Sequence, residues 1–187
     1  MSAILEIPEV RQRLSPLSVE EYHGLGEYNE NGRRTELIRG FVIEKISKSP
    51  LHSTIGSMLY DLLVTRLPRG YSIWKEEPLT FIDSEPEPDV SVVHGCEREF
   101  RDAHPSTAEL VVEVAVSSPV LDREMAFVYA EAGVKEYWIV LGRERAIEVY
   151  LQPENGQYQQ KLIFGSAQTV QSSSVPALQI RVGDLFS

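Results

Sequence analysis

Two carboxylates interrupt or introduce apolar runs, and they are the first indication of chemistry in this sequence. Asp89 follows Pro88 and opens the run "DVSVV", while Glu113 stands inside the run "LVVEVAV". Burying an ionised carboxylate without a partner is costly, so such a group is paired, protonated or bound to a metal. If the two strands are neighbours, both side chains converge and offer the oxygen ligands that Mg²⁺ and Mn²⁺ prefer. The pair therefore predicts a divalent-metal site.

Each carboxylate taken alone also has a structural explanation. An aspartate after proline is a common turn residue, because its side chain bonds nearby backbone amides. Glu113 by itself is explained equally well by a buried ion pair. Strand alternation places Val111, Glu113 and Ala115 on one face, so Glu113 points to one side of an otherwise apolar strand. It is the combination with Asp89 that favours a metal site.

The elements that must position these residues follow from periodicity and turn signals. Apolar residues at helical spacing predict a long helix over 51–67, and 122–133 predicts a second helix with Gly133 as its C-cap. Ser18 and Glu21 form a capping box for a short helix. Strands are expected within 35–47 (two, joined at Arg39-Gly40), 71–82, 83–94, 108–118, 136–141, 146–164 (a hairpin around Asn155-Gly156) and 175–186, with a polar loop over 94–107. Many strands with two main helices predict an α/β or α+β fold with a mixed sheet.

Length and composition indicate one soluble domain over 1–187, with 1–17 as an N-terminal arm. No window holds the roughly 20 apolar residues that a membrane span needs. The start, "MSAILEIPEVRQRL", has acidic residues and no basic leader, so we do not expect a secretory signal. The single cysteine, Cys96, excludes an internal disulfide framework and fits a reducing compartment. These features predict a cytoplasmic protein without a membrane partner.

The charge balance limits how the chain can contact nucleic acid. The 18 Lys and Arg residues face 28 Asp and Glu residues, for a net charge of −10. A protein that grips duplex phosphates usually presents a basic face, so DNA binding here requires a local basic patch. A solvated surface with no polyanionic partner explains the same balance. If DNA is bound, we expect weak affinity that falls steeply with salt.

Several blocks of the chain resemble a known family. Pro88-Asp89 and the later Glu113 resemble the PD-(D/E)XK nuclease superfamily, although this bare pattern is weak. The block "YAEAGVKEYWIV", after a strand with a central glutamate, is much more specific. Over nearly the whole chain the sequence is similar to a bacterial family of restriction-endonuclease-like proteins of poorly known function. The resemblance implies a nuclease core, with a mixed sheet flanked by helices and added β-hairpins, and Mg²⁺-dependent hydrolysis of DNA phosphodiester bonds.

The resemblance also implies roles for particular residues. Asp89 and Glu113 match the metal-ligand carboxylates, and the Val114 carbonyl is a candidate third ligand. Three further positions match the family's acidic and histidine positions near the site: Glu36, His52 and Glu77. His52 is equally readable as a surface or helix-capping residue, and Glu36 as an ion-pair partner of a nearby arginine among Arg33, Arg34 and Arg39. By analogy with nucleases that cut both strands, the fold also implies a homodimer.

The chain departs from the family pattern at the lysine. The superfamily lysine, two residues after the glutamate, is Ala115 here, and the family's alternative, in a helix run like "DREKA", is Met125. Methionine can neither stabilise developing charge on a phosphate nor orient a water. Arg123 projects to roughly the opposite side of the same helix. Lys75 shares a strand face with Glu77, so it is either the substitute or a solvated lysine. Two functions therefore stay open, a divalent-metal-dependent DNA endonuclease and a catalytically impaired binding or regulatory module.

Overall fold

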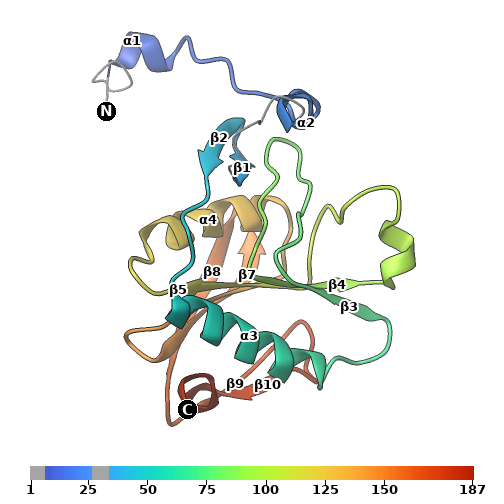
Figure 1. Ribbon diagram of the computed structural model, residues 1–187, viewed down its shortest axis with the longest axis vertical. Coiled ribbons are helices and arrows are strands. Elements are labelled where there is room, and N and C mark those ends of the chain that lie inside the picture. Colours follow the sequence, from blue (N-terminus) through green and yellow to red (C-terminus); the bar gives the residue numbers. More distant parts are fainter. Residues whose placement is uncertain (1–6, 27–33) are drawn as a thin grey trace.

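A six-stranded sheet forms the centre of the computed structural model, which describes residues 7–26 and 34–187 (Figure 1). Its strands in spatial order are β3 (Tyr71–Trp74), β4 (Val90–His94), β5 (Leu110–Ala115), β6 (Glu136–Leu141), β7 (Ala146–Glu154) and β8 (Gln157–Gly165). β5 and β6 are parallel, whereas the other neighbouring pairs are antiparallel. The predicted mixed sheet is confirmed.

Two helices cover opposite faces of this sheet, as Figure 1 shows for α3 (Pro50–Val64) and α4 (Val120–Glu131). α3 packs Ile55, Leu59 and Leu63 into one apolar cluster with alternate residues of β5 and β6. α4 packs Met125 and Tyr129 into a second cluster on the other face. Because β5 has a helix on each side, its apolar run fills both clusters, as expected of a central strand.

The remaining elements are short and lie outside the six-stranded sheet and its two covering helices. They are α1 (Pro8–Arg11), α2 (Val19–Gly26), the β1–β2 hairpin (Thr35–Ile38 and Phe41–Glu44), the 3₁₀ turn η2 (Glu97–Phe100), the β9–β10 pair (Thr169–Gln171 and Gln179–Arg181) and the 3₁₀ turn η3 (Val182–Phe186). The β1–β2 hairpin lies on the α4 side of the sheet, and β9, β10 and η3 lie on the α3 side (Figure 1). α1 buries no residue, and the extent of an N-terminal arm stays a prediction.

Local sequence signals explain several of these boundaries. The Ser18 hydroxyl accepts the Glu21 amide at 3.2 Å, and the Glu21 carboxylate accepts the Ser18 amide at 2.8 Å, which confirms the capping box. Gly133, with a φ of 73°, follows the end of α4, and Asn155-Gly156 turns the β7–β8 hairpin with both φ values positive. These turns fix the lengths of the elements that flank them.

Two expectations need correction. The strand expected over 71–82 ends at Trp74, because Glu76 adopts a left-handed φ of 56° and the chain leaves the sheet there. The loop expected over 94–107 contains η2. Across the described ranges 7–26 and 34–187, the helices are too short or too polar for one of them to cross a membrane.

Candidate functional site

Asp89 and Glu113 lie opposite one another, where the chain enters β4 beside β5. β4 and β5 are antiparallel neighbours in which Val90 pairs with Val112, so the next positions along each strand are Asp89 and Glu113. The amide of Val114 donates to Asp89 Oδ2 at 2.8 Å, and the amide of Asp89 donates to Glu113 Oε2 at 3.1 Å. The strands are therefore neighbours, which is the condition that the metal-site hypothesis set, and each carboxyl group accepts a hydrogen bond from a backbone amide of the opposite strand segment.

Two basic side chains contact Asp89. Lys48, in the stretch between β2 and α3, places Nζ 2.6 Å from Oδ1, and His52, in the first turn of α3, places Nε2 3.1 Å from Oδ2. Burial acts to raise the pKa of Asp89, but His52 and Lys48 outweigh it and lower that pKa to about 2. Asp89 is therefore an ionised carboxylate in a nearly closed setting, with a side chain only 9% exposed.

Glu113 has the opposite electrostatic environment. Tyr129, fully buried on α4, donates its hydroxyl to Glu113 Oε1 at 2.8 Å. Burial, followed by the negative charges of Asp89, Asp122 and Glu36, raises the pKa of Glu113 well above its usual range. Burial and the charge of Asp89 likewise raise the pKa of Asp122 to about 6. The site therefore concentrates carboxyl groups that repel one another, and an added cation would relieve this repulsion.

Glu36 takes part in a neighbouring cluster. Lys45 Nζ lies 2.6 Å from Glu36 Oε1 and donates to the Glu87 carbonyl at 2.7 Å. The Glu87 amide also donates to Glu36 Oε1, at 2.8 Å. β1 and the segment before Asp89 are thus joined by one lysine and one carboxylate.

The arginines considered as partners of Glu36 have other partners. Arg34 binds Glu76 and Glu87, at 3.2 and 2.9 Å. Arg39 binds Glu131 at 2.8 Å. Arg33 lies outside the described residues.

A small hollow of about 60 Å³ opens beside Asp89. It is lined by Lys48, His52, Ser53, Gly56, Ser57, Lys75, Glu76 and Asp89. Within it, Lys48 Nζ lies 3.0 Å from Glu76 Oε1 as well as 2.6 Å from Asp89. Burial acts to lower the pKa of Lys48, but its bonds to Asp89 and Glu76 outweigh it, so the pKa is raised. This hollow contains the ionised carboxylate of the site together with an ammonium group.

The acidic residue that lines this hollow together with Asp89 is Glu76, whereas the family resemblance pointed to Glu77. Because Glu76 has a left-handed backbone, strand alternation fails after Trp74, and its amide donates to the carbonyls of Pro88 and Asp89 at 3.2 and 3.3 Å. Glu77 is exposed and does not line the hollow.

Lys75 lines the hollow without contacting Asp89. Its Nζ donates to Ser57 Oγ at 3.2 Å and lies 5.8 Å from the centre of the Tyr60 ring. Lys48 was missed by sequence reasoning. The signal available was its place in "SKSPLHS", four residues before a histidine that was itself assigned to the site.

The family's lysine position lies in an apolar environment here. Met125 is 6% exposed and packs in the cluster between α4 and the sheet, together with Ala115. Arg123 is directed to Glu148, with two hydrogen bonds of 2.6 and 3.1 Å. Met125 carries no charge and Arg123 is bound to Glu148, so neither residue supplies a cation to Asp89.

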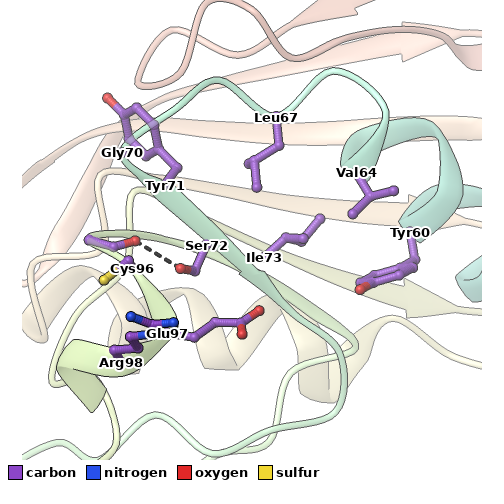
Figure 2. A pocket seen from close by; sticks show the side chains of 11 residues that line it. Tyr60, Val64, Leu67, Gly70, Tyr71, Ser72, Ile73, Cys96, Glu97 and Arg98 are labelled. Carbon is purple, nitrogen blue, oxygen red and sulfur yellow. Dashed lines mark hydrogen bonds between the residues drawn. The ribbon is translucent and has the colours of Figure 1, made fainter. Parts of the chain in front are cut away.

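A larger open groove of about 570 Å³ lies beside the edge strand β3 (Figure 2). Tyr60, Val64 and Leu67 of the α3 side and Ile73 of β3 give it an apolar floor, and Cys96, Glu97 and Arg98 lie along its rim. Tyr60 lines this groove, and the Lys75 ammonium lies over the Tyr60 ring. Because Lys75 also lines the hollow beside Asp89, it lies between the groove and that hollow. The groove itself holds no pair of carboxylates.

The donor atoms suit a hard cation that keeps much of its water. Among residues 7–26 and 34–187, no three His, Cys, Asp or Glu side chains are arranged as a ready metal cluster. Mg²⁺ commonly binds through only one or two carboxylates and retains several waters. Asp89 and Glu113 meet that requirement, and the excess of carboxyl groups around Glu113 favours a cation electrostatically. The residues present therefore fit a weakly held, water-rich divalent ion.

Comparisons with known proteins agree with this architecture. The model of the Uma2 family, described as "Putative restriction endonuclease", matches residues 19–183. A crystal structure described as "a putative nuclease belonging to DUF820", from Anabaena variabilis ATCC 29413, superposes with a TM-score of 0.73. It is 22% identical, and the match covers 91% of this chain and 98% of that one, which shows a shared fold. No curated protein matches the chain.

Proposed function

Because this chain belongs to the Uma2 family of restriction-endonuclease-like proteins, we propose that it hydrolyses DNA phosphodiester bonds as a divalent-metal-dependent endonuclease. The observation that carries the proposal is the position of Asp89 and Glu113, opposite one another on neighbouring strands and joined by backbone hydrogen bonds. Asp89 is paired with Lys48 and His52, but Glu113 lies among other carboxyl groups, and such groups are costly for a purely structural protein. They are useful to a protein that binds a cation there.

In this proposal Asp89 and Glu113 hold Mg²⁺ or Mn²⁺. The Val114 amide faces Asp89, and since the N–H and C=O of one strand residue point to the same edge, its carbonyl would be the third ligand. When bound, the ion would polarise the phosphate and lower the pKa of a water. His52 and Tyr129 keep Asp89 and Glu113 oriented, because His52 Nε2 lies 3.1 Å from Asp89 Oδ2 and the Tyr129 hydroxyl donates to Glu113 Oε1 at 2.8 Å.

The remaining site residues act around this pair. Glu36 adds negative charge and, through Lys45, fixes the segment before Asp89. We assign Lys75 to the DNA backbone, because it stands between the groove beside β3 and the hollow beside Asp89. Glu77 is exposed next to it, and we give Glu77 no direct part in catalysis.

The proposal extends to partners and location. DNA is the substrate class that the family implies, and the acidic chain would bind it weakly through a small basic patch. A homodimer would present two such sites to a duplex. A cytoplasmic location is proposed from the single cysteine.

Titration of Mn²⁺ into the wild type and Glu113→Gln, alongside plasmid nicking in the same buffer, tests this function. We expect the wild type to bind and nick, and Glu113→Gln to lose both. The control is Glu144→Gln, an exposed carboxylate, which should behave as the wild type. A wild type that neither binds Mn²⁺ nor nicks DNA would contradict the proposal.

A second candidate is a nuclease-fold binding or regulatory module without catalysis. It is favoured by Met125, which is buried among apolar residues where the family has a lysine. Mn²⁺ binding by the wild type without nicking, combined with a gain of nicking in Met125→Lys, would identify this module.

A further inference from the structure

One ammonium group contacts the candidate metal ligand directly. Lys48 Nζ lies 2.6 Å from Asp89 Oδ1 and 3.0 Å from Glu76 Oε1, in the hollow beside the site. Its side chain is 24% exposed, so the ammonium is accessible from that hollow. The geometry thus brings a lysine to the carboxylate from the α3 side, whereas position 125 would bring one from the α4 side.

We propose that Lys48 is the catalytic lysine of this chain and replaces the one that the family resemblance places at Met125. The inference rests on the nuclease function proposed above. Lys48 would bind a non-bridging oxygen of the scissile phosphate and stabilise the negative charge that grows there. In the reaction a water oxygen forms a bond to phosphorus, the bond from phosphorus to the leaving sugar oxygen breaks, and the water proton passes through solvent to that oxygen. Lys48 stays protonated throughout.

The other lysines near the site are less suited to this role. Lys75 contacts Ser57 and the Tyr60 ring rather than Asp89. Lys45 is held by the carboxylate of Glu36 and by the Glu87 carbonyl, and its side chain is only 16% exposed. Of these three lysines, only Lys48 both contacts Asp89 and is accessible from the hollow.

Lys48 is the partner of Asp89 Oδ1, whereas the other oxygen of that carboxylate has two partners of its own. Asp89 Oδ2 already accepts the Val114 amide at 2.8 Å and lies 3.1 Å from His52 Nε2. Lys48 belongs to an exposed stretch without helix or strand, in which Ile46 is 92% exposed. Its side chain therefore approaches Asp89 from the surface and is not part of the apolar core. A cation held on a flexible stem at the hollow can exchange one carboxylate contact for a phosphate contact.

The test compares Lys48→Met and Lys48→Arg with the wild type, measuring plasmid nicking and Mn²⁺ affinity for each. We expect Lys48→Met to lower the nicking rate about 100-fold or more, the range found when one charge-stabilising donor is removed. Mn²⁺ affinity should not fall, because the change removes a positive charge beside Asp89 and takes no ligand from the ion, and Lys48→Arg should retain part of the rate because it keeps the positive charge. Lys135→Met, a surface lysine paired with Glu109, is the matched control and should nick as the wild type.

A rescue experiment separates catalysis from structure. Adding Met125→Lys to Lys48→Met returns an ammonium to the site from α4, and we expect nicking to recover at least tenfold. A purely structural role for Lys48 would not be repaired from the opposite face of the sheet.

Three results would overturn the inference. Nicking by Lys48→Met at the wild-type rate would leave the nuclease function intact and reduce Lys48 to an ion pair. Tighter Mn²⁺ binding with undiminished nicking would make Lys48 a counterion that competes with the metal. A folded wild type that binds Mn²⁺ but nicks DNA only after Met125→Lys would show that Lys48 is not a catalytic lysine.

Discussion

Removing the Tyr129 hydroxyl should weaken both the fold and metal binding, because that hydroxyl donates to Glu113 at 2.8 Å. Tyr129→Phe keeps the buried ring and opens no large cavity, but it leaves one carboxyl oxygen without a partner. An unsatisfied buried acceptor costs about 1–3 kcal/mol, which for a chain of this size lowers Tm by roughly 2–4 °C per kcal/mol. Loss of a group that orients a metal ligand typically weakens metal affinity about 10–100-fold.

Tyr137→Phe is the matched control, since Tyr137 is equally buried, lies against Tyr129, and donates to the Asp122 carbonyl at 2.8 Å. We expect it to cost only about 0.5–1.5 kcal/mol and to leave Mn²⁺ affinity unchanged. Urea denaturation and Mn²⁺ titration of both variants measure the two effects. Equal losses of stability and equal Mn²⁺ affinities in the two variants would refute the assignment of Tyr129 to the site.

Three further predictions concern stability and DNA contact. Burial acts to raise the pKa of Glu148, but Arg123 and Lys161 outweigh it and lower that pKa to about 2, so the ionised group stabilises the fold above its ordinary pKa. At pH 7 the free energy of unfolding of the wild type should therefore exceed that of Glu148→Gln by about 1–3 kcal/mol. This difference should disappear as the pH falls from the ordinary pKa of a glutamate to about 2. Equal urea midpoints for the two proteins at pH 7 would contradict this. Gly156→Ala should cost about 1–2 kcal/mol in thermal melts because φ is 74°, whereas Gly24→Ala, in a helix with open space around it, should cost nothing; similar melts for both would refute the turn argument. DNA affinity should fall roughly 40-fold between about 50 and 200 mM salt for three phosphate contacts, and a flat response in a binding assay would exclude a phosphate-contacting patch.

Much of the fold is determined locally and could be predicted from the chain. The helix near 51–67 was predicted from apolar spacing, and α3 spans Pro50–Val64. The apolar run 110–115 forms a central strand, since β-branched residues without polar alternation are stable only between two covered faces. The sequence marked Asp89 and Glu113 as candidates, but their convergence depended on their strands being neighbours, and the antiparallel register of β4 and β5 places them opposite one another.

The tertiary structure decided which side chains join that pair. A single left-handed residue, Glu76, changes the facing of the chain after β3, so Glu76 lines the hollow while Glu77, the residue that the family resemblance indicated, is exposed. Lys48 reaches Asp89 across 41 positions from a segment with no periodic pattern to read.

The sequence by itself therefore determined most of the strands, the main helices and the two candidate carboxylates, because local periodicity and the cost of burying charge act over a few residues. Only the tertiary structure decided which cation lies beside Asp89. That choice depends on where α3 docks against the sheet, and docking is set by the shape of a whole apolar face rather than by any short stretch of residues.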